Sequence, residues 1–433
     1  MRILVITRHL KSGGSQRAAK VRGFGFADRG HDVAFLAFQE GGEREAEIRE
    51  RGLELFVGGT EASVRDAAVQ QATSWNPDLI HVHRPGPTDP ECAAVLRTLR
   101  DSKPSLSVIE CNHFGRVDYS PDRALIDVHM QLSEWCLWKF QQWSRGCNPR
   151  PVGVISPHVI ESQNFYPESD QVRREFREEH GIPRDAVVFG RFGSPIPGKW
   201  HPMIFDAFAK FAAKRPDAWL MVVGLPDLYK SAIDKLPPDA RRRVVQPPFL
   251  YGDKQLRRGY AAMDVFLHAA LIGESFGQVF GEAMLCNVPV ITVQTPMRDN
   301  SQVEVVGHQH GGLVVHDTDS MVRAMNELAQ DPELRARLGQ QGCQSVKDRF
   351  DTDVRITDLL KISDHTLAAK GDREVLRQRL KDDPTLISEV SWPRIVELMN
   401  IGYGKPSLKD RLGIHPLHNP TIYRAFRKLK HFE

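Results

Sequence analysis

The stretch Gly273-Glu-Ser-Phe-Gly-Gln-Val-Phe-Gly-Glu-Ala-Met-Leu-Cys-Asn-Val-Pro-Val-Ile-Thr292 predicts the end of one strand, a tight loop, a helix, a turn and a second strand. Ser275 and Gln278 have the spacing of a capping box, which predicts that the helix begins near Phe276. Asn287 tolerates the left-handed conformation that ends many helices, so we expect the helix to stop there. This succession of elements is the repeating unit of a parallel α/β sheet.

The same alternation of short apolar runs and helical patterns continues outward along the chain, and it restarts after Tyr166-Pro167. The expected strands are 3–6, 33–37, 53–57, 79–82, 107–109 and 152–155, then 187–189, 219–223, 244–245, 265–268, 288–293 and 313–315. We therefore predict an α/β fold with two doubly wound, Rossmann-like domains. The predicted ranges are 1–165 for the first domain, 166–365 for the second, and 366–433 for a helical and basic tail.

The composition excludes several classes of protein. A length of 433 residues fits two or three domains, and 58 Lys and Arg against 55 Asp and Glu give a net charge of only +3. That balance fits neither a disordered chain nor a dedicated nucleic-acid binder. The six cysteines form no C-x-x-C pair, so we expect reduced thiols. An apolar run of about 18 residues, which a membrane span needs, is missing, so we predict a cytoplasmic protein.

The opening stretch also predicts chemistry. The backbone amides of Ser275, Phe276, Gly277 and Gln278 lie at the N-terminus of this predicted helix, and helix N-termini bind phosphate groups. Glu274 and Glu282 flank these amides, too far apart along the helix to share one metal ion. They are suited to accept hydrogen bonds from hydroxyl pairs of a long, sugar-containing ligand. The alternative is a solvated pair of glutamates beside an ordinary helix.

Glu274-x7-Glu282 resembles the E-x7-E motif of the GT-B glycosyltransferases, specifically the large retaining family 4. The resemblance implies two domains that face each other across a cleft. It implies that Glu274 contacts hydroxyls of the transferred sugar, that Glu282 binds the nucleotide ribose, and that Asn300 in the following loop lies near the donor. The implied reaction moves a sugar from a nucleotide diphosphate sugar to an acceptor hydroxyl with retention of configuration.

Two more segments resemble the same family. Gly13 and Gly14 lie in a loop similar to its Gly-Gly-x-x-Arg loop, which approaches the donor diphosphate, although an ordinary turn would show the same glycines. Arg191 and Lys199 resemble its Arg and Lys pair, which neutralises the diphosphate leaving group and replaces a metal ion. The resemblance therefore implies that no metal or other cofactor is required. Lys199 departs from the pattern because it follows Arg191 by eight residues, where about five are usual.

Histidines and aspartates raise the question of a metal site. His81 and His83 alternate along a predicted strand, and with His113 they would offer imidazole ligands. The resemblance instead places His113 near the acceptor, and a hydrogen-bonded histidine at a strand end is the remaining alternative. The strings Asp317-Thr-Asp319 and Asp351-Thr-Asp353 spell D-x-D, but we expect them to cap helices and lie in surface loops. We predict no metal ligands in the chain.

The positive charge is concentrated at the end of the sequence. Residues 405–433 contain 7 Lys and Arg and 2 Asp and Glu, a net charge of +5, and the other 404 residues carry −2. We expect helical structure in 372–399, as in the family's C-terminal helix that returns to the first domain. The basic end has the composition of a segment that contacts an anionic membrane at its inner face or an acidic acceptor, and a solvated terminus is the alternative.

The predicted partners are a nucleotide sugar and a glycan, lipid-linked or small-molecule acceptor, with no nucleic acid. Two other functions stay open. A non-catalytic relative would bind a glycan or a sugar nucleotide without transferring anything. An NAD-dependent oxidoreductase would use Glu40 beyond the second strand as its ribose ligand, but the full G-x-G-x-x-G fingerprint is missing.

Overall fold

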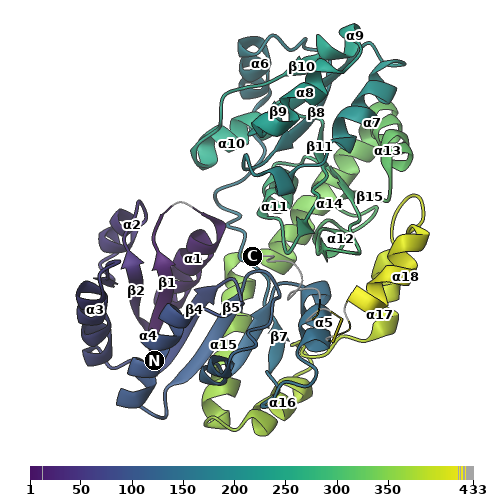
Figure 1. The fold of residues 1–433 in the computed structure, drawn as a ribbon. Helices are drawn as coiled ribbons and strands as arrows, with labels where there is room; N and C mark the ends of the chain where they lie inside the picture. Colours follow the sequence, from purple (N-terminus) through teal and green to yellow (C-terminus); the bar gives the residue numbers. More distant parts are fainter. Residues whose placement is uncertain (12, 418, 420, 423–424, 426–433) are drawn as a thin grey trace. The chain divides into compact units, whose positions relative to one another are not determined.

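The chain forms two compact units, shown in a computed structural model that describes residues 1–11, 13–417, 419, 421–422 and 425 (Figure 1). Unit 1 contains Met1–Val159 and Thr352–Trp392, and unit 2 contains Ile160–Asp351 and Pro393–Ile414. These bounds differ from the ranges 1–165, 166–365 and 366–433, because the chain returns to unit 1 at Thr352. None of the described helices is long and apolar enough to cross a bilayer.

Unit 1 is built on a seven-stranded sheet with the order β3-β2-β1-β4-β5-β6-β7, and every pairing in it is parallel. The strands are β1 (Arg2–His9), β2 (Asp32–Glu40), β3 (Glu54–Val57), β4 (Leu79–Arg84), β5 (Ser107–Asn112), β6 (Val128–Gln131) and β7 (Gly153–Ile155). The α-helices are α1 (Gly14–Asp28), α2 (Glu45–Glu50), α3 (Ala62–Ser74), α4 (Pro90–Ser102), α5 (Glu134–Trp143), α15 (Thr352–Ala369) and α16 (Arg373–Asp382).

Helices cover both faces of this sheet. On one face Leu4, Ile80 and their neighbours pack against α3 and α4. On the other face the ring of Phe26 in α1 contacts His81 in β4, with 5.3 Å between ring centroids. The predicted doubly wound arrangement is therefore confirmed for unit 1.

Unit 2 repeats the architecture with a six-stranded parallel sheet of order β10-β9-β8-β11-β13-β15. Its strands are β8 (Val187–Phe192), β9 (Ala218–Val223), β10 (Val244–Val245), β11 (Val265–His268), β13 (Val290–Val293) and β15 (Gly312–Val315), and β12 (Gly273–Glu274) pairs separately with β14 (Asp299–Asn300). The α-helices are α6 (Asp170–Glu179), α7 (Met203–Ala212), α8 (Lys230–Asp234), α9 (Pro238–Arg241), α10 (Gly252–Ala261), α11 (Gln278–Leu285), α12 (Gln302–Val306), α13 (Thr318–Gln330) and α14 (Pro332–Phe350).

The predicted helical tail is present and is shared between the units. Helix α16 lies in unit 1, whereas α17 (Trp392–Asn400) lies almost entirely in unit 2, so only the first part of 372–399 returns to the first unit. In unit 2 the Gln294 side chain donates hydrogen bonds to the carbonyl oxygens of Leu398, at 2.9 Å, and Ile401, at 2.6 Å. These bonds fix the end of α17, and α18 (Leu408–Leu417) follows. Most of the basic segment 423–430 lies outside the described residues.

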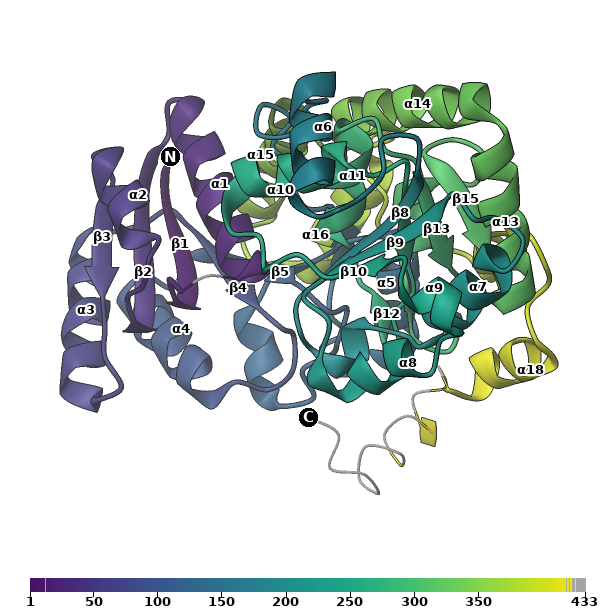
Figure 2. The ribbon, with the colours of Figure 1, turned by 90° about the horizontal axis from the view of Figure 1, so that it is seen from above.

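Glycines in two helices permit close packing. Gly23 and Gly25 each cost α1 about 1 kcal/mol of helix propensity relative to Ala. A Cβ atom at Gly23 would lie 2.3 Å from Phe35 in β2, and one at Gly25 would lie 2.4 Å from Ile356 in α15. In unit 2, α14 runs beside α11, and Gly339 meets the backbone of Asn287 at the end of α11 (Figure 2). These glycines therefore let α1 pack closely against β2 and α15, and let α14 pack closely against the end of α11.

We expect Gly25→Ala to lower the free energy of unfolding by about 1–3 kcal/mol, because overpacking against Ile356 outweighs the gain in helix propensity. Urea unfolding followed by circular dichroism measures the change. Gly14→Ala is the control, since a Cβ atom there meets nothing within 4 Å. Adding Ile356→Ala should cost less in the Gly25→Ala background than in the wild type. An unchanged or increased stability of Gly25→Ala would contradict this account of α1.

Candidate functional site

Charged side chains of unit 2 gather beyond the carboxyl ends of its strands, where doubly wound sheets bind ligands. Arg191 lies near the end of β8, His268 ends β11, and Glu274 ends β12. Lys199 ends a short 3-10 turn, Pro197–Lys199, in the loop after β8. The structure thus brings together Arg191, Lys199 and Glu274, which the sequence predicts as site residues, in one cluster.

Glu274 is the centre of this cluster. Its carboxylate accepts hydrogen bonds from Lys199 Nζ at 2.6 Å and from His268 Nε2 at 3.2 Å. Burial disfavours the ionised carboxylate, but the charge of Lys199 and the hydrogen bond from His268 outweigh burial and lower the pKa of Glu274 to about 2. Burial also lowers the pKa of His268, to about 4, with a further contribution from the charge of Arg191. At neutral pH the cluster therefore holds an ionised carboxylate beside a neutral imidazole.

Arg191 is a buried cation that holds the loop carrying Lys199. Its Nη2 donates to the carbonyl oxygen of Lys199 at 2.6 Å, and its Nη1 donates to the carbonyl oxygen of Phe192. The guanidinium lies over the ring of Trp200, 4.9 Å from the centroid. Burial lowers the pKa of Arg191 to about 10, so it stays charged at neutral pH. The loop folds back onto Arg191, which explains how a spacing of eight residues still brings the two cations together.

The start of α11 differs from the prediction. The helix begins at Gln278 rather than near Phe276, and it has no side-chain cap, so the predicted Ser275 and Gln278 capping box is wrong. Ser275 and Phe276 belong to an irregular turn instead, and Gly277 precedes the helix with a φ of 84°. A Cβ atom at Gly277 would lie 2.2 Å from the Phe280 ring, so this left-handed turn requires glycine.

Other parts of the predicted stretch agree with the structure. Asn287 has a φ of 58° just after α11, which confirms the predicted helix stop. Asp317 forms a capping box at the start of α13, as expected for the first D-x-D string.

The second motif glutamate, Glu282, lies inside α11 and is buried. The hydroxyl of Tyr260 in α10 donates to Glu282 Oε2 at 3.1 Å. Burial and the charge of Glu282 raise the pKa of Tyr260, which keeps the phenol protonated as a donor. Asn300, the residue paired with Glu274 across β12 and β14, uses its side chain inside the next loop. Its Oδ1 accepts from the backbone amide of Thr295 at 2.8 Å, so Asn300 shapes this loop.

Sequence reasoning missed His268 and Tyr260. His268 is a polar residue at the carboxyl end of a predicted buried strand. Because ligands bind at that end of parallel strands, its position could have predicted a site residue. Tyr260 lies within a helix and its partner Glu282 follows 22 residues later, so no local pattern connects the two.

Unit 1 contains the other predicted site residues. Gly13 and Gly14 begin α1, and His113 directly follows β5. A cavity opens at the carboxyl ends of β1, β4 and β5, at the point between β1 and β4 where the strand order reverses. Its lining includes Arg8, His9, Gln16, His83, Arg84 and His113. This is the position at which a doubly wound sheet binds a ligand.

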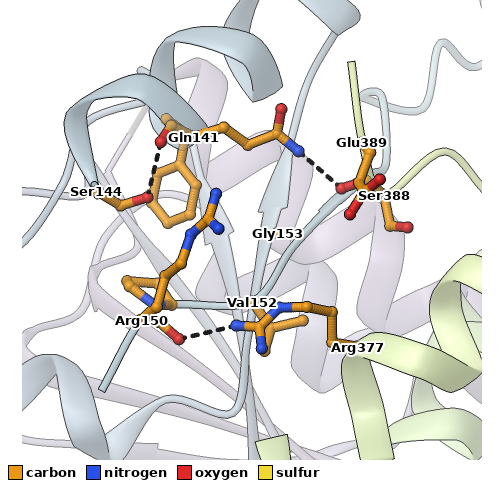
Figure 3. Close-up of a pocket in the computed structure, with 10 residues that line it drawn as sticks. Gln141, Ser144, Arg150, Val152, Gly153, Arg377, Ser388 and Glu389 are labelled. Carbon is orange, nitrogen blue, oxygen red and sulfur yellow. Dashed lines mark hydrogen bonds between the residues drawn. The ribbon is translucent and has the colours of Figure 1, made fainter. Parts of the chain in front are cut away.

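A second cavity of unit 1 lies between β7, at the edge of the sheet, and the C-terminal residues that return to this unit, such as Arg377 and Ser388 (Figure 3). Gln141 Nε2 donates to the carbonyl oxygen of Ser388 at 2.9 Å, and Arg377 Nη2 donates to that of Arg150 at 3.2 Å. Next to it the amide of Ile155 in β7 donates to the carbonyl oxygen of Ile387. These polar groups bind backbone, so the cavity belongs to the attachment of residues 386–390.

Residues 172–345, which contain Arg191, Lys199, Glu274, Glu282 and Asn300, match the family model described as Glycosyl transferases group 1. The match lies within unit 2 and covers less than half of the chain.

Curated relatives agree with the match to the group 1 model. The chain is 26% identical over 251 residues to a GDP-mannose-dependent monoacylated alpha-(1-6)-phosphatidylinositol monomannoside mannosyltransferase of Corynebacterium glutamicum, covering 54% of this chain and 62% of that protein. It is 27% identical over 218 residues to a D-inositol 3-phosphate glycosyltransferase of Stackebrandtia nassauensis, covering 48% of this chain and 47% of that protein. The chain thus matches only about half to three fifths of the length of these relatives.

Solved structures show the fold. HepE of Anabaena, solved with UDP-glucose, superposes with a TM-score of 0.67 at 18% identity, over 84% of this chain and 99% of that chain. A sucrose-phosphate synthase of Thermosynechococcus elongatus gives a TM-score of 0.63 at 17% identity, over 85% and 99%. The two parallel α/β units of the chain therefore have the GT-B architecture, as predicted.

We expect Lys199→Met to destabilise the protein at neutral pH and to lose this effect in acid. Because the pKa of Glu274 is lowered in the folded protein, its ionised carboxylate stabilises the fold at pH values above the ordinary pKa of 4.5. This stabilisation is lost as the pH falls toward about 2. Without Lys199 the pKa of Glu274 rises. The difference in unfolding free energy between wild type and variant should therefore shrink between pH 4.5 and pH 2, as measured by urea unfolding.

Lys210→Met is the matched control for this prediction. Lys210 Nζ lies 2.8 Å from Asp319, but both side chains are more than half exposed. Because exposed ion pairs contribute little to stability, its loss should leave the unfolding free energy nearly unchanged at every pH. A difference between wild type and Lys199→Met that stays constant with pH would contradict the cluster.

Proposed function

We propose that the protein is a retaining glycosyltransferase of family 4 that moves a sugar from a nucleotide diphosphate sugar to an acceptor hydroxyl. The observation that carries this proposal is the cluster of the buried Arg191 and Glu274 with the half-buried Lys199, inside the segment that matches the group 1 model. Two cations beside one carboxylate leave a net charge of +1, which suits a diphosphate whose negative charge grows as the sugar departs.

Each side chain of the cluster has a role in this proposal. Glu274 is ionised and accepts hydrogen bonds from hydroxyls of the transferred sugar, while Arg191 and Lys199 stabilise the leaving diphosphate. Glu282, positioned by Tyr260, binds the ribose. The backbone of Ser275, Phe276 and Gly277 approaches the phosphates ahead of α11, and Asn300 shapes the neighbouring donor loop.

The reaction needs no protein nucleophile in this proposal, because the departing phosphate takes the acceptor proton on the same face of the sugar. The protein contributes orientation and electrostatic stabilisation of the leaving group. The two cations take the place that a metal ion would fill, so no cofactor is required for transfer.

We propose that the acceptor binds in the cavity of unit 1 beside His113. The backbone of Gly13 and Gly14 is proposed to approach the donor diphosphate. The cavity is lined by Gln16, His83 and other groups that form hydrogen bonds, which suits a hydroxyl-rich acceptor. The relatives named above act on a phosphatidylinositol mannoside and an inositol phosphate, which supports a glycan or lipid-linked acceptor. The basic residues after Lys405 are proposed to contact the anionic inner face of a membrane.

We expect Glu282→Ala to weaken binding of the preferred donor at least tenfold, which corresponds to about 1.4 kcal/mol. A thermal-shift and hydrolysis panel of UDP, GDP and ADP sugars, with and without a chelator, identifies that donor and measures the loss. Glu333→Ala, at an exposed residue of the first turn of α14, is the control and should bind the donor like the wild type.

Unchanged donor affinity and turnover in Glu282→Ala would contradict the assignment. Donor-induced stabilisation without hydrolysis or transfer would instead indicate a non-catalytic sugar-nucleotide binder. Loss of hydrolysis on chelation, in protein that keeps its folded circular dichroism spectrum, would contradict the role given to Arg191 and Lys199.

A further inference from the structure

Four histidines form a buried row in unit 1. The ring centroids lie 5.7 Å apart between His81 and His83, 5.5 Å between His83 and His113, and 5.1 Å between His113 and His158. In the part of the chain that the structure describes, both ring nitrogens of His81 and His83 and Nε2 of His113 have no hydrogen-bond partner. Because unpaired buried polar groups cost about 1–3 kcal/mol each, the two unpaired ring nitrogens of His83 indicate a ligand beside this residue.

A cysteine belongs to the same cluster. His83 in β4 and Cys111 in β5 are directly paired across the parallel sheet, so their side chains point to the same face. His113 comes two residues after Cys111, so its side chain lies on the same side of the sheet as that of Cys111. The ligand atoms of His83, Cys111 and His113 all lie within 4.8 Å of one another, and all three residues are buried.

We propose that His83, Cys111 and His113 bind a zinc ion in unit 1, with His158 as the fourth ligand. Zinc prefers four-coordinate sites made of thiolate and imidazole ligands. The site is separate from the donor cluster, which belongs to unit 2, but His83 and His113 also line the cavity to which the acceptor is assigned. Its role is structural, because it joins the ends of β4 and β5 to the segment after β7.

The spacing of the ligand atoms supports a tetrahedral ion. Zinc bonds of about 2.0–2.1 Å to nitrogen and about 2.3 Å to sulfur place two nitrogens about 3.3 Å apart, and sulfur and nitrogen about 3.6 Å apart. His113 Nδ1 lies 3.3 Å from His158 Nε2 and 3.9 Å from Cys111 Sγ. The pair of His113 and His158 thus already has the spacing of a tetrahedral edge, and the other ligand atoms would move closer together on binding the ion.

A buried guanidinium lies beside the cluster. Arg22 donates hydrogen bonds to the carbonyl oxygens of Ser156 and Pro157, and it also interacts electrostatically with Cys111. A Cys111 thiolate would give this guanidinium and the zinc ion a shared negative charge.

The ion has a route to the site. His83 and His113 also line the cavity at the carboxyl ends of β1, β4 and β5, so the cluster is reached from that side.

The test uses the full chain, stripped with a chelator and reloaded with Zn²⁺ alone. Mass spectrometry of the metal content should give one zinc per chain, and zinc should raise the melting temperature. With Co²⁺ in place of zinc, a thiolate ligand should produce a charge-transfer absorption band in the near ultraviolet. Cys111→Ser should lose that band, whereas Cys92→Ser, at a buried cysteine of α4 that lines the same cavity, should keep it.

His83→Gln provides a second variant in case Cys111→Ser does not fold. It should keep the thiolate band but bind zinc at least tenfold more weakly, whereas His81→Gln, the neighbouring buried histidine outside the ligand set, should bind like the wild type. Failure of the wild-type chain to retain zinc would overturn the proposal. Full zinc affinity and an intact band in both Cys111→Ser and His83→Gln would overturn it as well.

Discussion

The ion pair of Lys199 with Glu274 is the interaction on which the candidate donor site depends. A buried carboxylate is stable in its ionised form only when nearby cations and hydrogen bonds offset the loss of water. Lys199 and His268 do this for Glu274, and Arg191 holds the loop that brings Lys199 back to it. The cluster therefore links three strand ends of unit 2 through one ion pair and the hydrogen bonds around it.

The sequence predicted most of this architecture because the apolar runs of buried parallel strands are nearly continuous. The strand that it missed, β6, alternates Val128 and Met130 with the polar His129 and Gln131. His129 is buried because its ring bonds the carboxylate of Glu110 in the neighbouring strand, and a contact of that kind leaves no local pattern. The short pair β12 and β14 was missed for a related reason, since two-residue strands carry no periodicity.

The positions of the candidate site residues show the same division between local pattern and tertiary contact. Glu274, Arg191 and Lys199 lie in motifs whose residues are close in sequence to a strand end, and the structure gathers them. The capping box at Ser275 and Gln278 has the right spacing but fails, because the chain is still extended at Glu274, where β12 pairs with β14. The turn at Gly277 then starts α11 two residues late. His268 and Tyr260 depend on tertiary contacts, which a single sequence does not reveal.

The central claim is that Arg191 and Lys199 hold the diphosphate of a nucleotide sugar. Calorimetric titration of the wild-type protein with a nucleoside diphosphate and the matching monophosphate tests it most directly. We predict that the diphosphate of the preferred base binds at least tenfold more tightly, or by about 1.4 kcal/mol. Equal affinity for the two nucleotides would contradict the account.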